Sequence, residues 1–311
     1  MNKEETSRLE NFLSKEIDLR EIIFVLWNRK FFLIGLSFLF SIISIFYSLS
    51  IPNKYTSESI LEVQSNSSAS STMSSIRSQF GGLASLAGIN LGSGTSGDKS
   101  FWVMERIKSK EFSKHIYSFP GVVEKFFAVE KYDPDKKKII YDEEIYKENV
   151  WQTRSSGKSF KPSFLQFHAA FNSVLDVQKN TETGFIDLKF EHLSPEFAEE
   201  LLNLVINEIN VLTKEGDKNE ATFSLEYLQS VLGKTSIEDT RLSINELIKT
   251  QLNIIMLADV KDFYILKPID LPFIPEVKSS PSRSLIVIMW SFFGFLFSSL
   301  YILVRHFYSK K

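Results

Sequence analysis

The chain has 311 residues, a formal net charge of −2 and no cysteine. The absence of cysteine excludes disulfides, thiol chemistry and zinc–cysteine sites. The near-neutral charge gives no reason to expect nucleic acid as a partner. With 28 phenylalanines, the composition is consistent with membrane spans and large packed surfaces.

The first strong signal is an uncharged apolar segment at residues 31–51. At about 1.5 Å per residue a helix of this length reaches about 30 Å, the hydrocarbon thickness of a bilayer, so it is predicted to span once. A cleaved signal peptide fits poorly because about 30 residues, rich in acids, precede the segment. Residues 17–27 show helical apolar spacing, which predicts either an interfacial lead-in helix or a docking site for a cytoplasmic partner.

Residues 55–63 are predicted to form a strand, with Leu61 and Val63 on one face. The Gly/Ser-rich stretch 65–98 follows and is predicted to be a loop. Gly92, Gly97, Lys99 and Ser100 come near a phosphate-loop pattern, but Asp98 interrupts it and no apolar strand precedes it. Nucleotide binding is therefore not expected.

The middle of the chain combines helix and strand patterns. One helix is expected over 99–117, capped by Asp98 or Ser100, and a short one over 162–171. Strands are expected near 174–178 and after Gly184, where apolar and charged residues alternate. Together these elements predict an α+β body with a small mixed sheet.

The longest helical pattern covers residues 194–257. Ser194 and Pro195 suit the N-cap and the first helical position. An unbroken helix would be about 95 Å long. Gly216 and Gly233 are possible breaks, and two or three shorter helices are the alternative.

A returning strand is expected at residues 263–266, where it could pair with 55–63 and close the domain. The proline-rich stretch 268–284 then favours an extended stem, because proline fixes φ and lacks a donor. Its prolines are Pro268, Pro272, Pro275 and Pro281. A second uncharged segment at 285–304 is predicted to cross the membrane again.

Basic residues set the expected orientation. Four lysines or arginines lie within about 20 residues before the first span and one after it, which places the N-terminus in the cytoplasm. Two spans return the C-terminus to the same side. The expected division is a cytoplasmic segment at 1–30, a first span at 31–51, a periplasmic domain at 52–284, a second span at 285–304 and a cytoplasmic tail at 305–311.

Small residues recur on one face of each span. They are Ser37, Ser41, Ser44 and Ser48 in the first, and Ser291, Gly294 and Ser298 in the second. Small residues permit close helix contact, and serines can bond across it for about 0.6 kcal/mol each. These seven positions are the predicted membrane helix packing site.

No catalytic constellation is found. The histidines His115, His168, His192 and His306 share no ligand spacing, and the carboxylates at 142–144 are interpreted as a solvated face. We therefore name no catalytic, cofactor-binding or metal-ligating residue.

Several stretches together resemble the Wzz chain-length determinants, the polysaccharide co-polymerases of the bacterial inner membrane. They are Tyr55-Thr56-Ser57-Glu58, Gly81-Gly82-Leu83-Ala84, Leu193-Ser194-Pro195-Glu196-Phe197-Ala198, Ile269-Asp270-Leu271-Pro272-Phe273-Ile274-Pro275-Glu276 and Pro281-Ser282-Arg283. They occur in the family's order, across almost the whole chain. The short tail after Val304 resembles the kinase-free type.

The resemblance implies a non-enzymatic regulator that sets the chain length of a lipid-linked surface polysaccharide such as O-antigen. Its implied partners are further copies of itself in a ring, a separate membrane polymerase, the growing lipid-linked polysaccharide and the lipid bilayer. The long helices would project from the membrane. An adaptor that couples polysaccharide synthesis to export of capsule or exopolysaccharide is the alternative.

Overall fold

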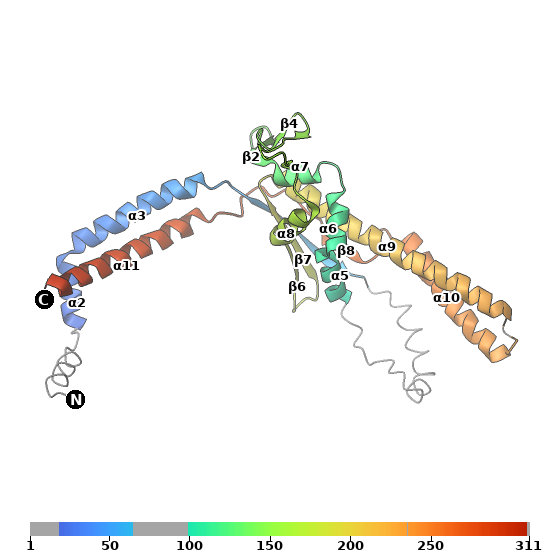
Figure 1. Cartoon of the computed structure of the whole chain (residues 1–311). Coiled ribbons are helices and arrows are strands. Elements are labelled where there is room, and N and C mark those ends of the chain that lie inside the picture. Colours follow the sequence, from blue (N-terminus) through green and yellow to red (C-terminus); the bar gives the residue numbers. More distant parts are fainter. Residues whose placement is uncertain (1–18, 65–98, 235, 310–311) are drawn as a thin grey trace, which may run out of the picture. The chain divides into compact units, whose positions relative to one another are not determined.

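The computed structural model describes residues 19–64, 99–234 and 236–309. The chain separates into unit 1, Met1–Asn53 with Ser279–Lys311, and unit 2, Lys54–Lys278. Figure 1 follows the chain through both. The predicted loop at 65–98 and the imperfect phosphate-loop pattern ending at Ser100 fall wholly or largely outside the described residues. The remainder is an α+β structure with a small sheet, a long helix and an apolar helix toward each end of the chain, as expected.

The described residues of unit 1 form the helices α2 (Leu19–Asn28), α3 (Lys30–Ser50) and α11 (Arg283–Ser309). The helices α3 and α11 lie side by side (Figure 1). Both are long and apolar enough to cross a membrane. The predicted lead-in helix is α2, and its Val25 packs with Leu33 and Ile302 in a small buried cluster.

Unit 2 is built on a four-stranded sheet with the order β6-β7-β1-β8. The strands are β1 (Tyr55–Val63), β6 (Leu175–Lys179), β7 (Ile186–His192) and β8 (Leu266–Asp270). Every neighbouring pair is antiparallel, so the predicted mixed sheet is wrong in this respect. The reason lies in the connections. A short turn joins β6 to β7, which makes this pair antiparallel. β7 and β8 run in the same direction, but β1 lies between them, so they do not pair.

Alternation along the strands explains which face is buried. Ile186, Leu188 and Phe190 of β7 are fully buried, as predicted, and Leu61 of β1 joins the same core. The expected closure also forms, since Val63 pairs with Leu266, but the returning strand is Leu266–Asp270 and not the predicted 263–266. This pairing brings the two chain segments nearest α3 and α11 together.

The helices before β6 differ from prediction at one point. The single helix expected over 99–117 is two helices, α5 (Lys99–Lys108) and α6 (Lys110–Tyr117). Ser109 breaks the pattern because its hydroxyl accepts the N–H of Phe112 at 3.1 Å and caps α6. α7 (Val122–Phe127) and α8 (Phe164–Val174) follow, the latter with a capping box from Ser163 to Gln166.

Two small hairpins lie between α7 and α8, in a stretch where the sequence allowed no clear prediction. β2 (Val129–Asp133) pairs with β3 (Lys138–Tyr141), and β4 (Tyr146–Lys147) pairs with β5 (Val150–Trp151). Short, charged strands carry too few apolar positions to show a period of two.

The long helical region is a hairpin of α9 (Pro195–Lys234) and α10 (Glu238–Val260), which lie side by side (Figure 1). The unbroken helix of about 95 Å is therefore wrong, and α9 with 40 residues reaches about 60 Å. Neither Gly216 nor Gly233 interrupts α9. The break comes after Lys234, where α10 starts with two acids that suit a helix N-terminus.

Asn210 joins the long helix to the last strand. Its side chain is almost fully buried, and its Oδ1 accepts the N–H groups of Ile265 and Leu266 at 2.8 and 3.0 Å. Its Nδ2 donates to the carbonyls of Leu266 and Ile206 at 2.9 and 2.8 Å. All four hydrogen-bonding positions of the amide are used. This residue therefore fixes α9 to the start of β8.

His192 ends β7 within an aromatic cluster. Its ring meets Phe197 edge to face with centroids 4.7 Å apart, and its Nδ1 accepts the N–H of Ser194 at 3.1 Å. Burial lowers the pKa of His192 from 6.5 to about 4, because the charged ring would lose its hydration.

We expect unit 2 to lose stability as the pH falls from 7 to 5. Between pH 6.5 and about 4 the unfolded chain binds the His192 proton and the folded chain does not. The free energy of unfolding therefore rises with pH across this window, and it should be about 2 kcal/mol lower at pH 5 than at pH 7. Hydrogen exchange of the β7 amides in the full chain measures this. In His192→Asn the difference should largely disappear, and an equal pH dependence in that variant would contradict the assignment.

Candidate functional site

The predicted packing site lies between α3 and α11, which approach each other closely at Gly294. A Cβ atom at Gly294 would lie 2.9 Å from the Cβ of Phe40 and 3.1 Å from the Cα of Ser37. A Cβ contact under 3.0 Å is essentially never seen, and the contact of 3.1 Å is with a backbone atom, which cannot swing away as a side-chain end can. Position 294 therefore requires glycine if the helices keep this distance.

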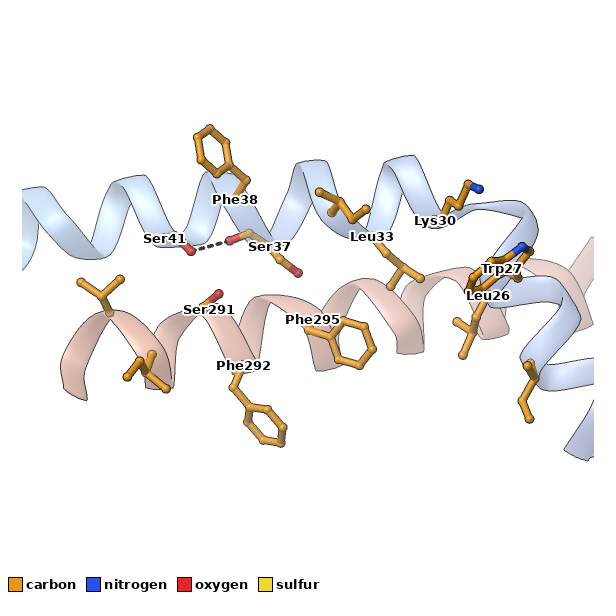
Figure 2. Close-up of a pocket in the computed structure, with 14 residues that line it drawn as sticks. Leu26, Trp27, Lys30, Leu33, Ser37, Phe38, Ser41, Ser291, Phe292 and Phe295 are labelled. Carbon is orange, nitrogen blue, oxygen red and sulfur yellow. Dashed lines mark hydrogen bonds between the residues drawn. The ribbon is translucent and has the colours of Figure 1, made fainter. Parts of the chain in front are cut away.

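The predicted serines are only partly brought together. Ser44, Ser48 and Ser298 are buried, whereas Ser37, Ser41 and Ser291 are half-buried. Figure 2 shows Ser291 directed from α11 toward the side of α3 that carries Ser37 and Ser41.

The recorded serine bonds run back to the same helix and not across the pair. Ser41 donates to the Ser37 carbonyl at 3.0 Å, Ser44 to the Ser41 carbonyl at 2.8 Å and Ser298 to the Phe295 carbonyl at 2.8 Å. In the part of the chain that the structure describes, the buried hydroxyls of Ser37 and Ser48 have no partner. The serines thus serve this contact through their small size.

Aromatic rings line the same helix pair. Phe40 lies 6.4 Å from Trp290 and 6.5 Å from Phe297, and Phe32 stacks on Tyr301 at 5.7 Å between ring centroids. These contacts continue on both sides of Gly294. Close backbone contact at the glycine therefore allows ring contacts above and below it.

A cavity of about 900 Å³ opens along this helix pair. Figure 2 shows α3 and α11 lining it, with Trp27 and Lys30 at the α2 end. Lys30 Nζ lies 5.1 Å from the Trp27 ring centroid. A lysine and a tryptophan at one end of an apolar helix are typical of a membrane interface.

The structure divides the predicted proline-rich stem. Pro268 lies inside β8, opposite Leu61, at the edge of the sheet where a missing N–H is tolerated. Pro272 and Pro275 are buried in unit 2, and Pro281 belongs to unit 1 after a cis peptide bond.

Two buried serines of β1 fasten the first part of this stretch. Ser57 donates to the Phe273 carbonyl at 2.8 Å, and Ser59 donates to the Asp270 carbonyl at 2.6 Å. Residues 268–275 therefore pack on the sheet and do not form a free stem. The alternation pattern could not show this, because serine on a buried face is unexpected without its distant carbonyl partner.

The histidines have separate local roles. His115 Nε2 lies 2.6 Å from Glu208 Oε2, and His168 Nδ1 lies 2.9 Å from Ser113 Oγ. Among residues 19–64, 99–234 and 236–309, no group of three side chains is arranged to hold a metal ion.

A stretch that includes α2, α3 and β1 matches a known family. Residues 15–101 match the model of the Wzz family, described as chain length determinant protein. The match thus includes the first apolar helix, the first strand of the sheet and the first two sequence stretches that carry the resemblance, residues 55–58 and 81–84.

Two solved structures are also similar to this chain. One, described as a full-length bacterial polysaccharide co-polymerase, has 12% identity and a TM-score of 0.40, with 94% of this chain and 98% of that chain covered. The other is a fragment of WzzB, a polysaccharide co-polymerase from Salmonella Typhimurium, with 14% identity, a TM-score of 0.33 and 73% and 100% coverage. A comparison with curated proteins finds no match.

Sequence reasoning missed the contacts of three residues within the two units. Phe40 supplies the surface that Gly294 contacts, Asn210 joins α9 to β8, and Arg283 binds Asn53 at the start of α11. Of the residues in these contacts, only Gly294 was identified from the sequence, as one of the small residues on its helix. A contact between residues that are far apart in the sequence leaves no signal in a single sequence.

Proposed function

We propose that this protein is a non-enzymatic regulator of the chain length of a lipid-linked surface polysaccharide such as O-antigen, and that it acts with a separate membrane polymerase. The observation that carries the proposal is the Wzz match at residues 15–101. The two apolar helices toward the ends of the chain fit an inner membrane protein with a large domain outside the bilayer.

The proposed topology has both termini in the cytoplasm and unit 2 in the periplasm. The excess of lysine and arginine before α3 supports this orientation. The antiparallel pairing of β1 with β8 supports it too, since both connections from the spans enter the same sheet. The end of α3 and the start of α11 would then both lie on the periplasmic side of the membrane.

The proposed role of the helix pair is to organise an oligomer and to contact the polymerase. Many apolar side chains of α3 and α11 are exposed in the single chain, among them Phe38, Phe46, Ile288 and Phe292. Lipid can cover these side chains, and so can further helices. The helices of further copies, arranged in a ring, are the occupants we propose.

The test is deletion of the gene followed by gel analysis of the surface polysaccharide. We expect the ladder to lose its preferred length while polymer is still made. Complementation with the full chain should restore the preferred length.

Two other results would contradict the proposal. Loss of all surface polymer would indicate that the protein couples synthesis to export instead of controlling length. An unchanged ladder would exclude control of length. Membrane expression of the complementing chain must be measured in parallel, because a chain that fails to insert would also leave the ladder unrestored.

A further inference from the structure

We propose that unit 1 holds a binding site for a phosphate group carried on a long hydrocarbon chain, at the end of the helix pair where α3 ends and α11 begins. A cavity of about 420 Å³ lies there. Its lining residues are Ile45, Ser48, Leu49, Arg283, Ser284, Val287 and Ile288. All of them belong to unit 1.

Ser48 is the observation that points to a ligand. Its side chain is 2% exposed, it lines the cavity, and its hydroxyl has no partner among the described residues. A buried hydroxyl without a hydrogen bond is unfavourable, because it has lost its contact with water and gained no partner. Ser41 and Ser44 on this helix avoid that cost by bonding to a carbonyl of the preceding turn, whereas Ser37 does not. An acceptor in the cavity would satisfy Ser48.

Arg283 supplies the charge. Its Nη2 donates to Asn53 Oδ1 at 3.0 Å, which holds the guanidinium beside the cavity, and its Nε is buried without a partner in the described part of the chain. Among those residues no carboxylate lies within ion-pair distance of it. The guanidinium therefore keeps both its full charge and an unused donor for an anion.

The start of α11 adds to this attraction. Arg283 is the first residue of a helix of 27 residues, and the first hydrogen bond recorded there runs from Ile286 N to Ser282 O at 3.2 Å. The N–H groups of a first turn have no partner within the helix, and the helix dipole places partial positive charge at that end. Phosphate is the anion that such an arrangement favours.

The rest of the cavity decides what carries the phosphate. Ile45, Leu49, Val287 and Ile288 form an apolar wall that continues along both helices from the charged end. Val287 and Ile288 also line the larger cavity of Figure 2. A free inorganic phosphate would leave this wall unused. A hydrocarbon chain lying along it would bury apolar surface on both partners.

Binding can be measured on the purified full chain in detergent by native mass spectrometry. The probes are phosphatidylglycerol, a polyprenyl phosphate, the uncharged polyprenol and inorganic phosphate. We expect a lipid phosphate to be retained in preference to polyprenol and inorganic phosphate. Whether phosphatidylglycerol or polyprenyl phosphate binds more tightly identifies the source of the lipid phosphate, and either result supports the site.

The variants separate this site from general attraction of lipid to a basic protein. Arg283→Gln should weaken retention about tenfold, since it removes a charged hydrogen-bond donor, and Ser48→Ala should weaken it less. Arg283→Lys should restore part of the binding. The control is Arg305→Gln, an exposed arginine near the other end of α11, which should bind as the wild type does.

The proposal is overturned if Arg283→Gln and Arg305→Gln retain equal amounts of lipid phosphate. It is also overturned if polyprenol binds as well as the phosphate forms, or if inorganic phosphate binds as well as they do. The measurement uses no polysaccharide. It can therefore fail while length control is confirmed, or succeed while length control is refuted.

Discussion

Replacing Asn210 by alanine is expected to destabilise unit 2 by about 4 kcal/mol, because three buried backbone groups would lose their partner at a cost of about 1–3 kcal/mol each. These groups are the N–H of Ile265 and the N–H and carbonyl of Leu266. The methyl group of alanine cannot replace any of them, and water has little access to a side chain that is 4% exposed.

Hydrogen exchange on the full chain locates this loss. Asn210→Ala should speed exchange of the β8 and α9 amides, while the amides of α3 and α11 in unit 1 should change little. The matched control is Asn207→Ala, an exposed asparagine one turn earlier on α9, which should change stability by less than about 0.5 kcal/mol. Equal exchange in the two variants would show that the Asn210 bonds do not hold β8.

Loss of the Asn210 hydrogen bonds should also affect the connection between unit 2 and α11. β8 is the last strand before α11, and its partner β1 is the first element after α3. Release of β8 would free the connection to the second apolar helix from the sheet. We therefore expect Asn210→Ala to broaden the polysaccharide length distribution if the protein controls length as proposed.

Replacing Gly294 by leucine is expected to force α3 and α11 apart. Even alanine would place a Cβ 2.9 Å from the Phe40 Cβ and 3.1 Å from the Ser37 Cα. Alanine normally stabilises a helix by about 1 kcal/mol relative to glycine, but overpacking costs about 1–3 kcal/mol and the backbone contact cannot yield. Alanine should therefore weaken the pair, and leucine should weaken it by about 3 kcal/mol or more.

The absence of cysteine makes this measurable by cross-linking. A cysteine pair, Phe32→Cys with Tyr301→Cys, replaces two rings whose centroids are 5.7 Å apart on the two helices. Cross-linking in membranes should fall sharply when Gly294→Leu is added. Gly35→Ala is the matched control, since a Cβ at Gly35 meets no atom within 4 Å.

The function gives a second measurement for Gly294. If the helix pair organises the proposed oligomer, Gly294→Leu should also broaden the distribution of polymer length, while Gly35→Ala should leave the preferred length unchanged. Full cross-linking in Gly294→Leu would show that the contact tolerates a side chain. An unaltered ladder with reduced cross-linking would separate helix pairing from length control.

Structural features that depend on residues close in the sequence were predicted well. Uncharged length identified α3 and α11, alternation identified the buried face of β7, and Ser194 with Pro195 marked the start of α9. Each of these signals depends on the chain's own periodicity or on a local cap. For Ser194 the cap is observed directly, since its Oγ accepts the N–H of Phe197 at 3.2 Å.

Features that depend on distant partners were decided only in the tertiary structure. Two helices end where the apolar pattern continues. At Ser109 a new N-cap interrupts the pattern, and after Lys234 the chain turns so that α10 packs against α9. Each interaction outweighs the weak intrinsic helix propensity of the residues at the break. The four bonds of Asn210 join positions more than 50 residues apart or one helical turn apart.

The helix pair shows the same division. Sequence by itself determined that two segments can cross a bilayer and that Gly294 lies among small residues on one of them, since length and residue size are local properties. The tertiary structure decided that Phe40 and Ser37 contact this glycine and that Arg283 and Ser48 line one cavity. The physical reason is that close packing and charge recognition depend on which atoms meet across the two helices, and a single sequence does not record those contacts.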